Sequence, residues 1–365
     1  MASRRLGREL RALRTSIAIG SVVVLALSVC KSAPASDDGT ASSPRLASLQ
    51  PVVIDAAPPA VLEASEGGAT RAEFRNVDFH MTPDVVLDIH YLDGAMKSVV
   101  SGQPVVFDEK SSFVIQIDTA RVGLTSQNLD ALMNRYVFAY KGAPLRNLRF
   151  EVKDSQLVQS GVLHKVVNIP FRITAALSVT NEGLVRIHPV AIRIFDVDGE
   201  GLMKALGIQL QDLLDLRRAR GVTVQGNDLL LNASQLLPPP AISGRVVAAR
   251  VENGEVVQIF GRDSMNGSGT DGVGSPPPSV RDSIPPLDSS ATNFLRFKGG
   301  TLRFGRLFMV DADMQIIDKD QHDPFDFSID DYNRQLVAGY SRNTVAGALK
   351  VFMPDLDDIG ASHPN

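Results

Sequence analysis

The side chains in this sequence that are best suited to acid–base or metal chemistry are histidines and aspartates in its first half. Asp88 and His90 stand two residues apart in an alternating segment, so both lie on one face of a predicted strand, as metal ligands can. His164 and His188 are the other residues that a hydrolase or metalloenzyme would have to use. Histidines on the solvent-facing side of a strand are usually polar surface, so the sequence favours neither a metal site nor a catalytic residue.

Acidic residues also gather in the C-terminal part of the chain. Oxygen ligands at this spacing suit calcium, but the segment lacks the glycine and the bidentate glutamate of an EF-hand loop. Solvated turns between strands are the favoured interpretation, and calcium binding stays open. The residues concerned are Asp311, Asp313, Asp318, Asp320, Asp323, Asp326, Asp330 and Asp331.

Several common enzyme motifs do not occur in the sequence. It has no G-x-S-x-G nucleophile elbow, no P-loop, no H-E-x-x-H pair and, with a single cysteine, no C-x-x-C pair. We therefore expect a protein that is not an enzyme and that carries no cofactor.

The elements that would position any site are arranged around one very long predicted β-hairpin, from Val166 to Val197. Seven apolar residues of its first arm alternate with polar ones over 13 residues, or roughly 43 Å, where a usual strand has about 5–6 residues. Thr180 to Gly183 supply the reversal, and His188-Pro189 predicts a bulge because proline donates no ladder hydrogen bond. The inward residues of the first arm are Val167, Ile169, Phe171, Ile173, Ala175, Leu177 and Val179.

Two helices are expected to cover this apolar face. Residues 126–140 have helical spacing after a capping Thr125 or Ser126, and a second helix is expected from Leu202 to about Arg217. Because a flat sheet of this length would expose its apolar side, the predicted fold class is α+β. Its long antiparallel sheet is strongly curled and wrapped around one or two amphipathic helices, and a β-rich C-terminal part follows.

The composition along the chain divides it into five predicted parts. Residues 1–35 are an export signal, 36–72 a flexible tether, 73–261 the α+β domain, and 262–292 a linker rich in Pro, Gly and Ser. The last part, 293–358, is expected to be β-rich and docked on the first domain, because some sixty residues make a marginal core alone. Its predicted strands are 301–310, 314–318, 332–340 and 348–353.

The N-terminus predicts export to the periplasm or cell envelope. Five arginines precede an apolar run from Ile17 to Val29, and Ala33-Pro34-Ala35 is a cleavage site, so the mature chain is expected to begin at Ser36. Acylation at Cys30 and an uncleaved membrane anchor are the alternatives.

The charge of the mature chain argues against nucleic acid as a partner. The whole chain has 37 basic and 41 acidic residues, of which the first 35 residues contain six and one. The remaining 31 basic and 40 acidic residues give a net charge of −9, which repels nucleic acid and anionic bilayers at long range.

The order of elements from about Val85 to Gly261 resembles a known family. A capped helix, a very long antiparallel sheet, a second helix and the final hairpin from Leu237 to Gly261, with Asn253-Gly254 at its turn, are similar to exported bacterial lipid-binding proteins of the tubular (TULIP-like) superfamily. Within it, the resemblance is to the periplasmic mannosyltransferase-enhancing family, formerly a domain of unknown function. This resemblance implies a curled sheet around a helix, with an apolar groove for acyl chains.

The leading hypothesis is an exported, non-enzymatic protein that binds or carries a lipid or another apolar small molecule between sheet and helix. The alternative is a structural or assembly scaffold of the cell envelope, with a filled core, no ligand and envelope proteins as partners. The same apolar residue types serve an acyl groove and a packed core, so the sequence does not separate the two. The residues expected to line a groove are Leu129, Leu132, Met133, Tyr136, Ile169, Phe171, Ile173 and Leu177.

Overall fold

A computed structural model describes residues 68–153, 155–164, 167–195, 197–198, 209–261, 284 and 286–360. The expected export signal, the tether up to residue 67 and most of the linker lie outside these residues and stay predictions. In the described part of the chain, no helix has both the length and the apolar character that crossing a bilayer requires.

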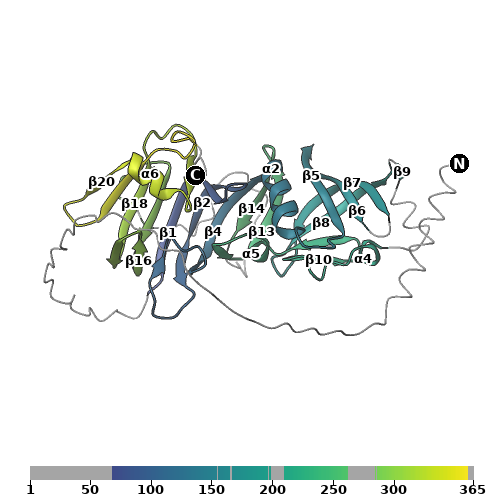
Figure 1. The fold of residues 1–365 in the computed structure, drawn as a ribbon, viewed down its shortest axis with the longest axis horizontal. Coiled ribbons are helices and arrows are strands. Elements are labelled where there is room, and N and C mark those ends of the chain that lie inside the picture. The colour runs from purple at the N-terminus through teal and green to yellow at the C-terminus, as the bar shows by residue number, and fades with distance from the viewer. Residues whose placement is uncertain are drawn as a thin grey trace, which may run out of the picture. The chain divides into compact units, whose positions relative to one another are not determined.

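The largest element of the fold is an eleven-stranded, mostly antiparallel sheet, called here the large sheet (Figure 1). Its strands are β1 (Thr70–Thr82), β2 (Val85–Ser98), β4 (Phe113–Thr125), β12 (Ala241–Ser243), β13 (Val246–Glu252), β14 (Glu255–Phe260), β15 (Phe294–Lys298), β18 (Asp313–Asp318), β19 (Phe325–Ser328), β20 (Tyr340–Asn343) and β21 (Leu349–Met353). Their order is β13-β14-β4-β2-β1-β15-β18-β21-β20, with β12 paired to β4 and β19 paired to β1. Strands from both sides of the predicted linker therefore belong to one sheet.

Two further sheets pack with the large sheet. The second sheet has the order β10-β11-β8-β7-β6-β5, with β9 on β8, and a small sheet has the order β17-β16-β3. Strands of the second sheet are β5 (Leu145–Lys153), β6 (Gln156–His164), β7 (Asn168–Val179), β8 (Val185–Ile194), β9 (Val197–Asp198), β10 (Val222–Gln225) and β11 (Asp228–Leu231). Those of the small sheet are β3 (Val105–Val106), β16 (Thr301–Phe304) and β17 (Leu307–Val310).

The described helical segments are short. They are α2 (Ser126–Ala131), the π-helical η1 (Leu132–Val137), α4 (Leu210–Leu213), α5 (Ala233–Leu236) and α6 (Tyr332–Ala338). The predicted cap of the first helix is confirmed, since the Thr125 hydroxyl accepts a hydrogen bond from the Asn128 amide.

The predicted central hairpin is confirmed as β7 and β8. Gly183 in the turn has a φ of 81°, which glycine adopts without steric cost. The register between the strands shifts where Pro189 lies opposite Ala175, so the predicted bulge is also present. The hairpin predicted around Asn253-Gly254 forms β13 and β14, and both turn residues have positive φ.

The expected fold class, α+β with a strongly curled sheet wrapped around helices, is wrong. Most described residues of the folded part are in strands, none of the described sheets is strongly curled, and the helical segments have four to seven residues. An apolar sheet face needs an apolar cover, and here other strands supply most of it. The helix α2 contacts β2, β4 and β5, so it fills the junction between the two larger sheets and does not form the centre of a wrapped sheet.

Three predicted elements are also wrong in detail. Residues 301–310, predicted as one strand, form the two strands β16 and β17 of a hairpin. The helix expected from Leu202 to Arg217 lies partly outside the described residues, and its described portion ends at Leu213, since Leu214 is already extended. Residues 332–340, predicted as a strand, form α6 up to Ala338. Strand-like composition there was overridden by packing, because Tyr332 is buried against Phe304.

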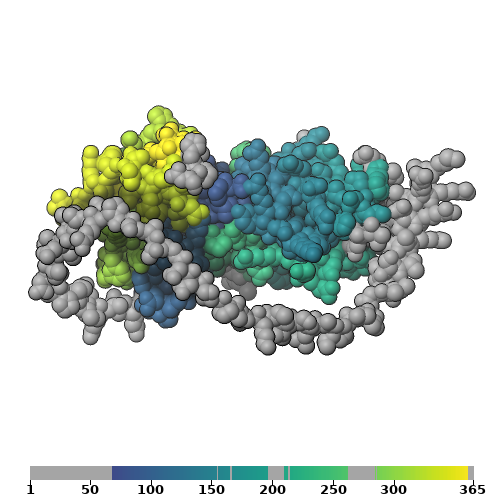
Figure 2. Space-filling model, viewed as in Figure 1, coloured from purple at the N-terminus to yellow at the C-terminus, as the bar shows by residue number. Residues whose placement is uncertain are grey.

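Strands β1, β2 and β4 form the common wall of two apolar cores. At the C-terminal side, aromatic rings pack closely: the Phe107 centroid lies 5.2 Å from that of Phe304 and 5.5 Å from that of Phe297. At the other side the wall faces the second sheet with mainly aliphatic residues. Figure 2 shows part of the segment that contains β1, β2 and β4, in purple-blue, at the surface between C-terminal residues in yellow and second-sheet residues in teal.

A buried polar row crosses the large sheet on β1, β15 and β18. Glu73 lies opposite Arg296, which lies opposite Gln315, and all three are almost fully buried. Burial raises the pKa of Glu73 from its usual 4.5 to about 7, although the ion pair with Arg75, 2.7 Å away, opposes this change. The folded protein therefore favours the neutral Glu73 carboxyl at mildly acidic pH.

This buried carboxyl predicts a loss of stability as the pH rises. The unfolded chain ionises Glu73 from about pH 4.5, whereas the folded protein does so only near pH 7, so the free energy of unfolding should fall between these values. Glu73→Gln removes this ionisation. Measured by urea unfolding, the free energy of unfolding of the variant minus that of the wild type should therefore increase by about 2 kcal/mol from pH 5 to pH 8. The matched control is Glu109→Gln, at an exposed position, which should leave the free energy of unfolding equal to that of the wild type at both pH 5 and pH 8. An equal effect of Glu73→Gln at both pH values would contradict the prediction.

Candidate functional site

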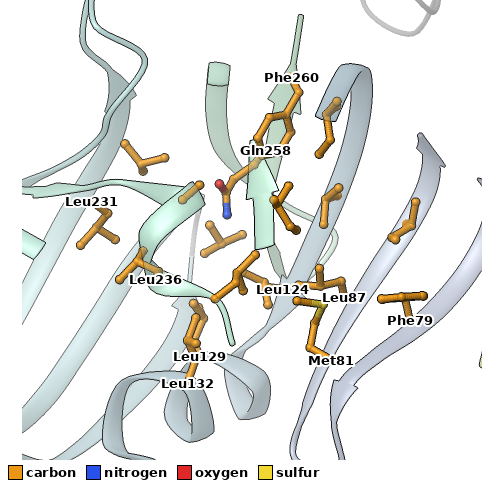
Figure 3. A pocket seen from close by; sticks show the side chains of 18 of the residues that line it. Phe79, Met81, Leu87, Leu124, Leu129, Leu132, Leu231, Leu236, Gln258 and Phe260 are labelled. Atoms are coloured by element: carbon orange, nitrogen blue, oxygen red, sulfur yellow. The ribbon is translucent and has the colours of Figure 1, made fainter. Parts of the chain in front are cut away.

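The main candidate site is an apolar cavity at the junction of the large sheet and the second sheet. Its walls come from β1, β2, β4, β12 and β14 on one side and from β5 to β8 and β11 on the other, and the segments α2, η1 and α5 contribute the rest. Of its 26 lining residues, Gln258 is the one polar residue. Figure 3 shows the Gln258 amide among these apolar side chains.

The cavity is broad in wall area and narrow in cross-section. The space between its walls is about 980 Å³, including the part that opens to solvent, yet only about 60 Å³ can hold the centre of a water-sized molecule. The space is therefore a slit, which suits a slender chain or a flat ring better than a globular ligand.

Alternation along the long strands directs the lining side chains into the cavity. Leu87 and Ile89 of β2 line it while Asp88 between them faces the other side, as the period of two requires. Ile115 and Ile117 of β4 line it in the same way. The strands thus present a hydrocarbon wall on one side and charged groups on the other.

Hydrogen bonds tie the helical wall of the cavity to β5. The Asn134 side chain donates to the Leu148 carbonyl at 2.8 Å and accepts from the Leu148 amide at 2.9 Å. The Asp130 carboxylate accepts from the Phe150 amide at 2.7 Å and from Arg149 at 2.8 Å. These bonds fix α2 and η1 so that Leu129, the predicted lining residue, faces inward.

The structure distributes seven of the eight predicted lining residues over two cavities. Leu129, Leu132, Met133 and Leu177 all line the main cavity. Tyr136 lines neither cavity and has 36% of its surface exposed. The three others line a second, smaller cavity; they are Ile169, Phe171 and Ile173.

The second cavity continues along the same face of the second sheet. It lies against β6, β7 and β8 and is closed in part by Leu210 and Leu214, in and just after α4. Residues of β7 with odd numbers line both cavities, from Ile169 in the second to Leu177 in the main one. The buried Ala175, 1% exposed, lies between these two sets. One apolar strand face therefore forms the floor of both cavities.

Sequence reasoning missed the contribution of the large sheet to the site. Val256, Gln258 and Phe260 of β14 line the cavity, and their even-numbered alternation in a hairpin was a usable signal. The buried Gln258 side-chain oxygen has no hydrogen-bond partner among the residues that the structure describes. This oxygen can accept a hydrogen bond from a ligand that enters the otherwise apolar space.

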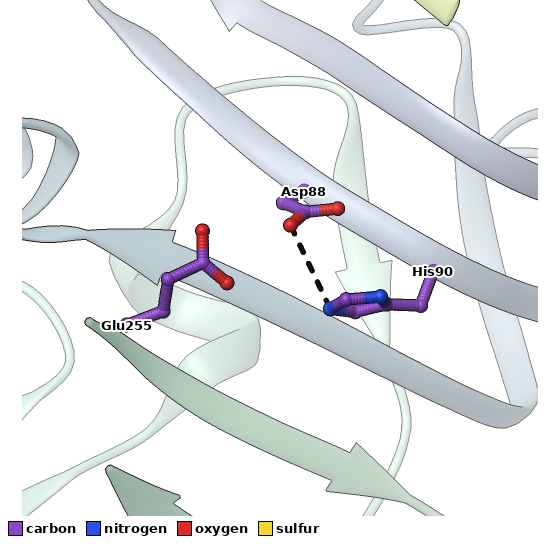
Figure 4. A group of neighbouring side chains, drawn as sticks. All are labelled: Asp88, His90 and Glu255. Atoms are coloured by element: carbon purple, nitrogen blue, oxygen red, sulfur yellow. Dashed lines mark ion pairs between the residues drawn. The ribbon is translucent and has the colours of Figure 1, made fainter. Parts of the chain in front are cut away.

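A second group of functional side chains lies on the opposite face of the large sheet. Asp88 and His90 of β2 lie beside Glu255 of β14, and the atoms that could bind a metal are all within 4.8 Å of one another (Figure 4). Burial, the charge of Asp88 and a hydrogen bond with Asp88 raise the pKa of Glu255 to about 7. Burial and the neighbouring Asp88 also raise the pKa of Asp78, to about 6.

The other histidines considered from the sequence are not part of this group. His164 Nδ1 lies 2.7 Å from the Asn168 side-chain oxygen, and His188 Nδ1 lies 2.6 Å from the Asp228 carboxylate. Among the described residues, neither belongs to a cluster of three metal-binding side chains.

The aspartates near the C-terminus form a compact group in part. Asp318, Asp320 and Asp355 lie together, and burial is the main cause that raises the pKa of Asp355 to about 7. The Asp318 carboxylate accepts hydrogen bonds from the amides of Asp320 and Gln321 and from the Asn293 side chain. These hydrogen bonds organise the turn that follows β18.

Comparisons of this chain with protein-family models, with curated proteins and with solved structures find no match in any of the three. The function is therefore inferred from the cavity and from the charged face of the sheet.

Proposed function

We propose that this protein binds a lipid or another slender apolar molecule in the cavity between the large and second sheets. The observation that carries the proposal is a space walled by 26 residues of which 25 are apolar. Apolar burial at about 25 cal/mol per Å² makes such a space a favourable site for hydrocarbon and an unfavourable one for water. The protein acts as a binder or carrier and carries out no reaction in this proposal.

The contrast between the two apolar cores supports this function. Nine aromatic residues fill the C-terminal core with ring centroids 4.5–6.2 Å apart between neighbours, as close packing requires. The same long strands leave unfilled space beside the second sheet. Unfilled space costs stability in proportion to its volume, so a cavity kept next to a well-packed core suggests an occupant.

The resemblance to exported lipid-binding proteins, expected from the sequence, implies an acyl chain as ligand, and this proposal names the same class of ligand. An exported carrier needs a protein surface that keeps hydrocarbon out of water, and a slit between sheets provides one. The second candidate function is a scaffold whose cavities stay empty or collapse around their own side chains. The small space open to a water-sized molecule, about 60 Å³, favours that alternative.

Narrowing the slit distinguishes the two functions. Leu177 lines the main cavity from β7 and is only half-buried, so Leu177→Trp should be tolerated by the fold and should occupy ligand space. Excluding about two methylenes costs about 1.6 kcal/mol, and the affinity for a fluorescent long-chain fatty acid should fall about tenfold. Fluorescence titration of delipidated protein measures this change.

The control lies one residue away on the opposite face of the strand. Ser178 is exposed, so Ser178→Trp adds the same ring outside the cavity and should leave the affinity unchanged. Circular dichroism checks that both variants are folded. Wild-type protein that binds no such probe, and that carries no lipid in native mass spectrometry, would leave the scaffold as the function.

The partnerless Gln258 oxygen makes a prediction about ligand polarity. The wild-type protein should prefer a long-chain alcohol over its methyl ether by about fivefold, because one hydrogen bond contributes about 1 kcal/mol. Gln258→Leu should abolish this preference and raise the stability of the empty protein by about 1 kcal/mol, since a buried unpaired group is removed. Gln116→Leu, at an exposed position on β4, is the control and should change neither quantity. A preference that survives Gln258→Leu would show that the oxygen does not contact the ligand.

A further inference from the structure

The charged face of the large sheet carries a second site, built from side chains that the apolar cavity does not use. Asp88 and His90 project from β2, and Glu255 projects from β14, with β4 between these strands (Figure 4). All three side chains are partly exposed, so an ion in solution can reach them. They lie on the face opposite to Leu87 and Ile89, which line the cavity.

Gly123 makes the meeting of these side chains possible. It lies on β4 directly opposite Asp88, and a β-carbon at this position would overlap the Glu255 carboxylate and touch Asp88. A larger residue on the intervening strand would therefore displace the end of the Glu255 side chain from its place above Gly123.

A hydrogen bond joins Asp88 and Glu255, whereas the distance from His90 to Asp88 suits two ligands of a shared ion better than a direct bond. His90 Nε2 and the Asp88 carboxylate are 3.6 Å apart, which is too long for a hydrogen bond. Ligand atoms around a tetrahedral ion with bonds of about 2.1 Å are roughly 3.4 Å apart. All the possible ligand atoms lie within 4.8 Å of one another, so a small movement of the Glu255 side chain would bring its carboxylate to the same ion.

The surrounding charges also favour a cation. Asp326, Asp78 and Asp88 lie opposite one another on three successive strands, and like charges in this arrangement repel. Their ion-pair partners in the described structure are histidines, His80 for Asp326 and His90 for Asp88.

Asp326, Asp78 and Asp88 form an acidic row, and Glu255 lies beside it. The positive charge of Arg121 acts on Glu255, but the Arg121 guanidinium forms its ion pair with the Glu252 carboxylate, 3.1 Å away. Among the described residues, no arginine or lysine forms an ion pair with the acidic row or with Glu255.

We propose that Asp88, His90 and Glu255 bind a divalent first-row transition-metal ion such as Zn²⁺. One imidazole nitrogen and two carboxylates form a mixed set of the kind that Zn²⁺ accepts, whereas Ca²⁺ prefers oxygen ligands alone. Three protein ligands leave at least one coordination position for water. The site is independent of the apolar cavity and of the function proposed for it.

Isothermal titration calorimetry with Zn²⁺ alone, on full-length protein freed of metal by chelation, tests the site. One ion per chain should bind, with a Kd below about 100 µM, and Ca²⁺ should bind at least about tenfold more weakly. Glu255→Gln and His90→Gln should each weaken Zn²⁺ binding about tenfold or more. Circular dichroism establishes that these variants are folded.

The matched control is His188→Gln. His188 forms a histidine–carboxylate pair with Asp228, as His90 does with Asp88, but it has no third ligand. This variant should bind Zn²⁺ like the wild type. Absence of Zn²⁺ binding to folded wild-type protein would overturn the proposal and leave Asp88 and Glu255 as a hydrogen-bonded carboxyl pair. Equal weakening by His188→Gln, or binding unaffected by Glu255→Gln and His90→Gln, would overturn it as well.

Discussion

The structure depends on the pairing of three long neighbouring strands, β1, β2 and β4. Backbone hydrogen bonds pair them along strands of more than ten residues each, with a few local shifts of register, and alternation then gives the two faces opposite chemistry. One face supplies a wall to the aromatic core and to the aliphatic cavity. The other face carries the acidic row. A change of register by one residue would exchange these faces, so every site described here relies on this pairing.

Local irregularities adapt this shared wall to its two neighbours. Asn76 has a φ of 49°, and the partner of β1 along one edge changes at this point. Strand β15 pairs with residues 71–75 and β19 with residues 77–80. The register between β2 and β4 also shifts between Ile89 and Tyr91. Irregularities of this kind change which residues face inward, so even-numbered Phe74 is buried before Asn76, and odd-numbered Val77, Phe79 and Met81 are buried after it.

The sequence predicted strands and turns well and the cover of the sheet poorly. Alternation around Phe171 and the Asn253-Gly254 turn are local signals, and the corresponding hairpins were found as expected. Which element covers an apolar face depends on contacts between residues far apart in sequence, and periodicity does not report these. For the same reason only half of the residues expected to line a groove lie at the main cavity, whereas Gln258 and the whole wall formed by β14 were missed. Glu255 was missed as a neighbour of Asp88 because the two are brought together only by the order of strands.

The split edge of β1 has a kinetic consequence for the newly made chain. Hairpins β1–β2 and β7–β8 close over short loops, but β1 meets β15 and β19 only after more than two hundred further residues have been joined. Closing such a distance is slow, and an unpaired strand edge is open to pairing with other chains in the meantime. The C-terminal strands β15 and β19 therefore cover the edge of β1 only late in synthesis. Until they pair with it, this protein is most prone to aggregate or to bind a chaperone.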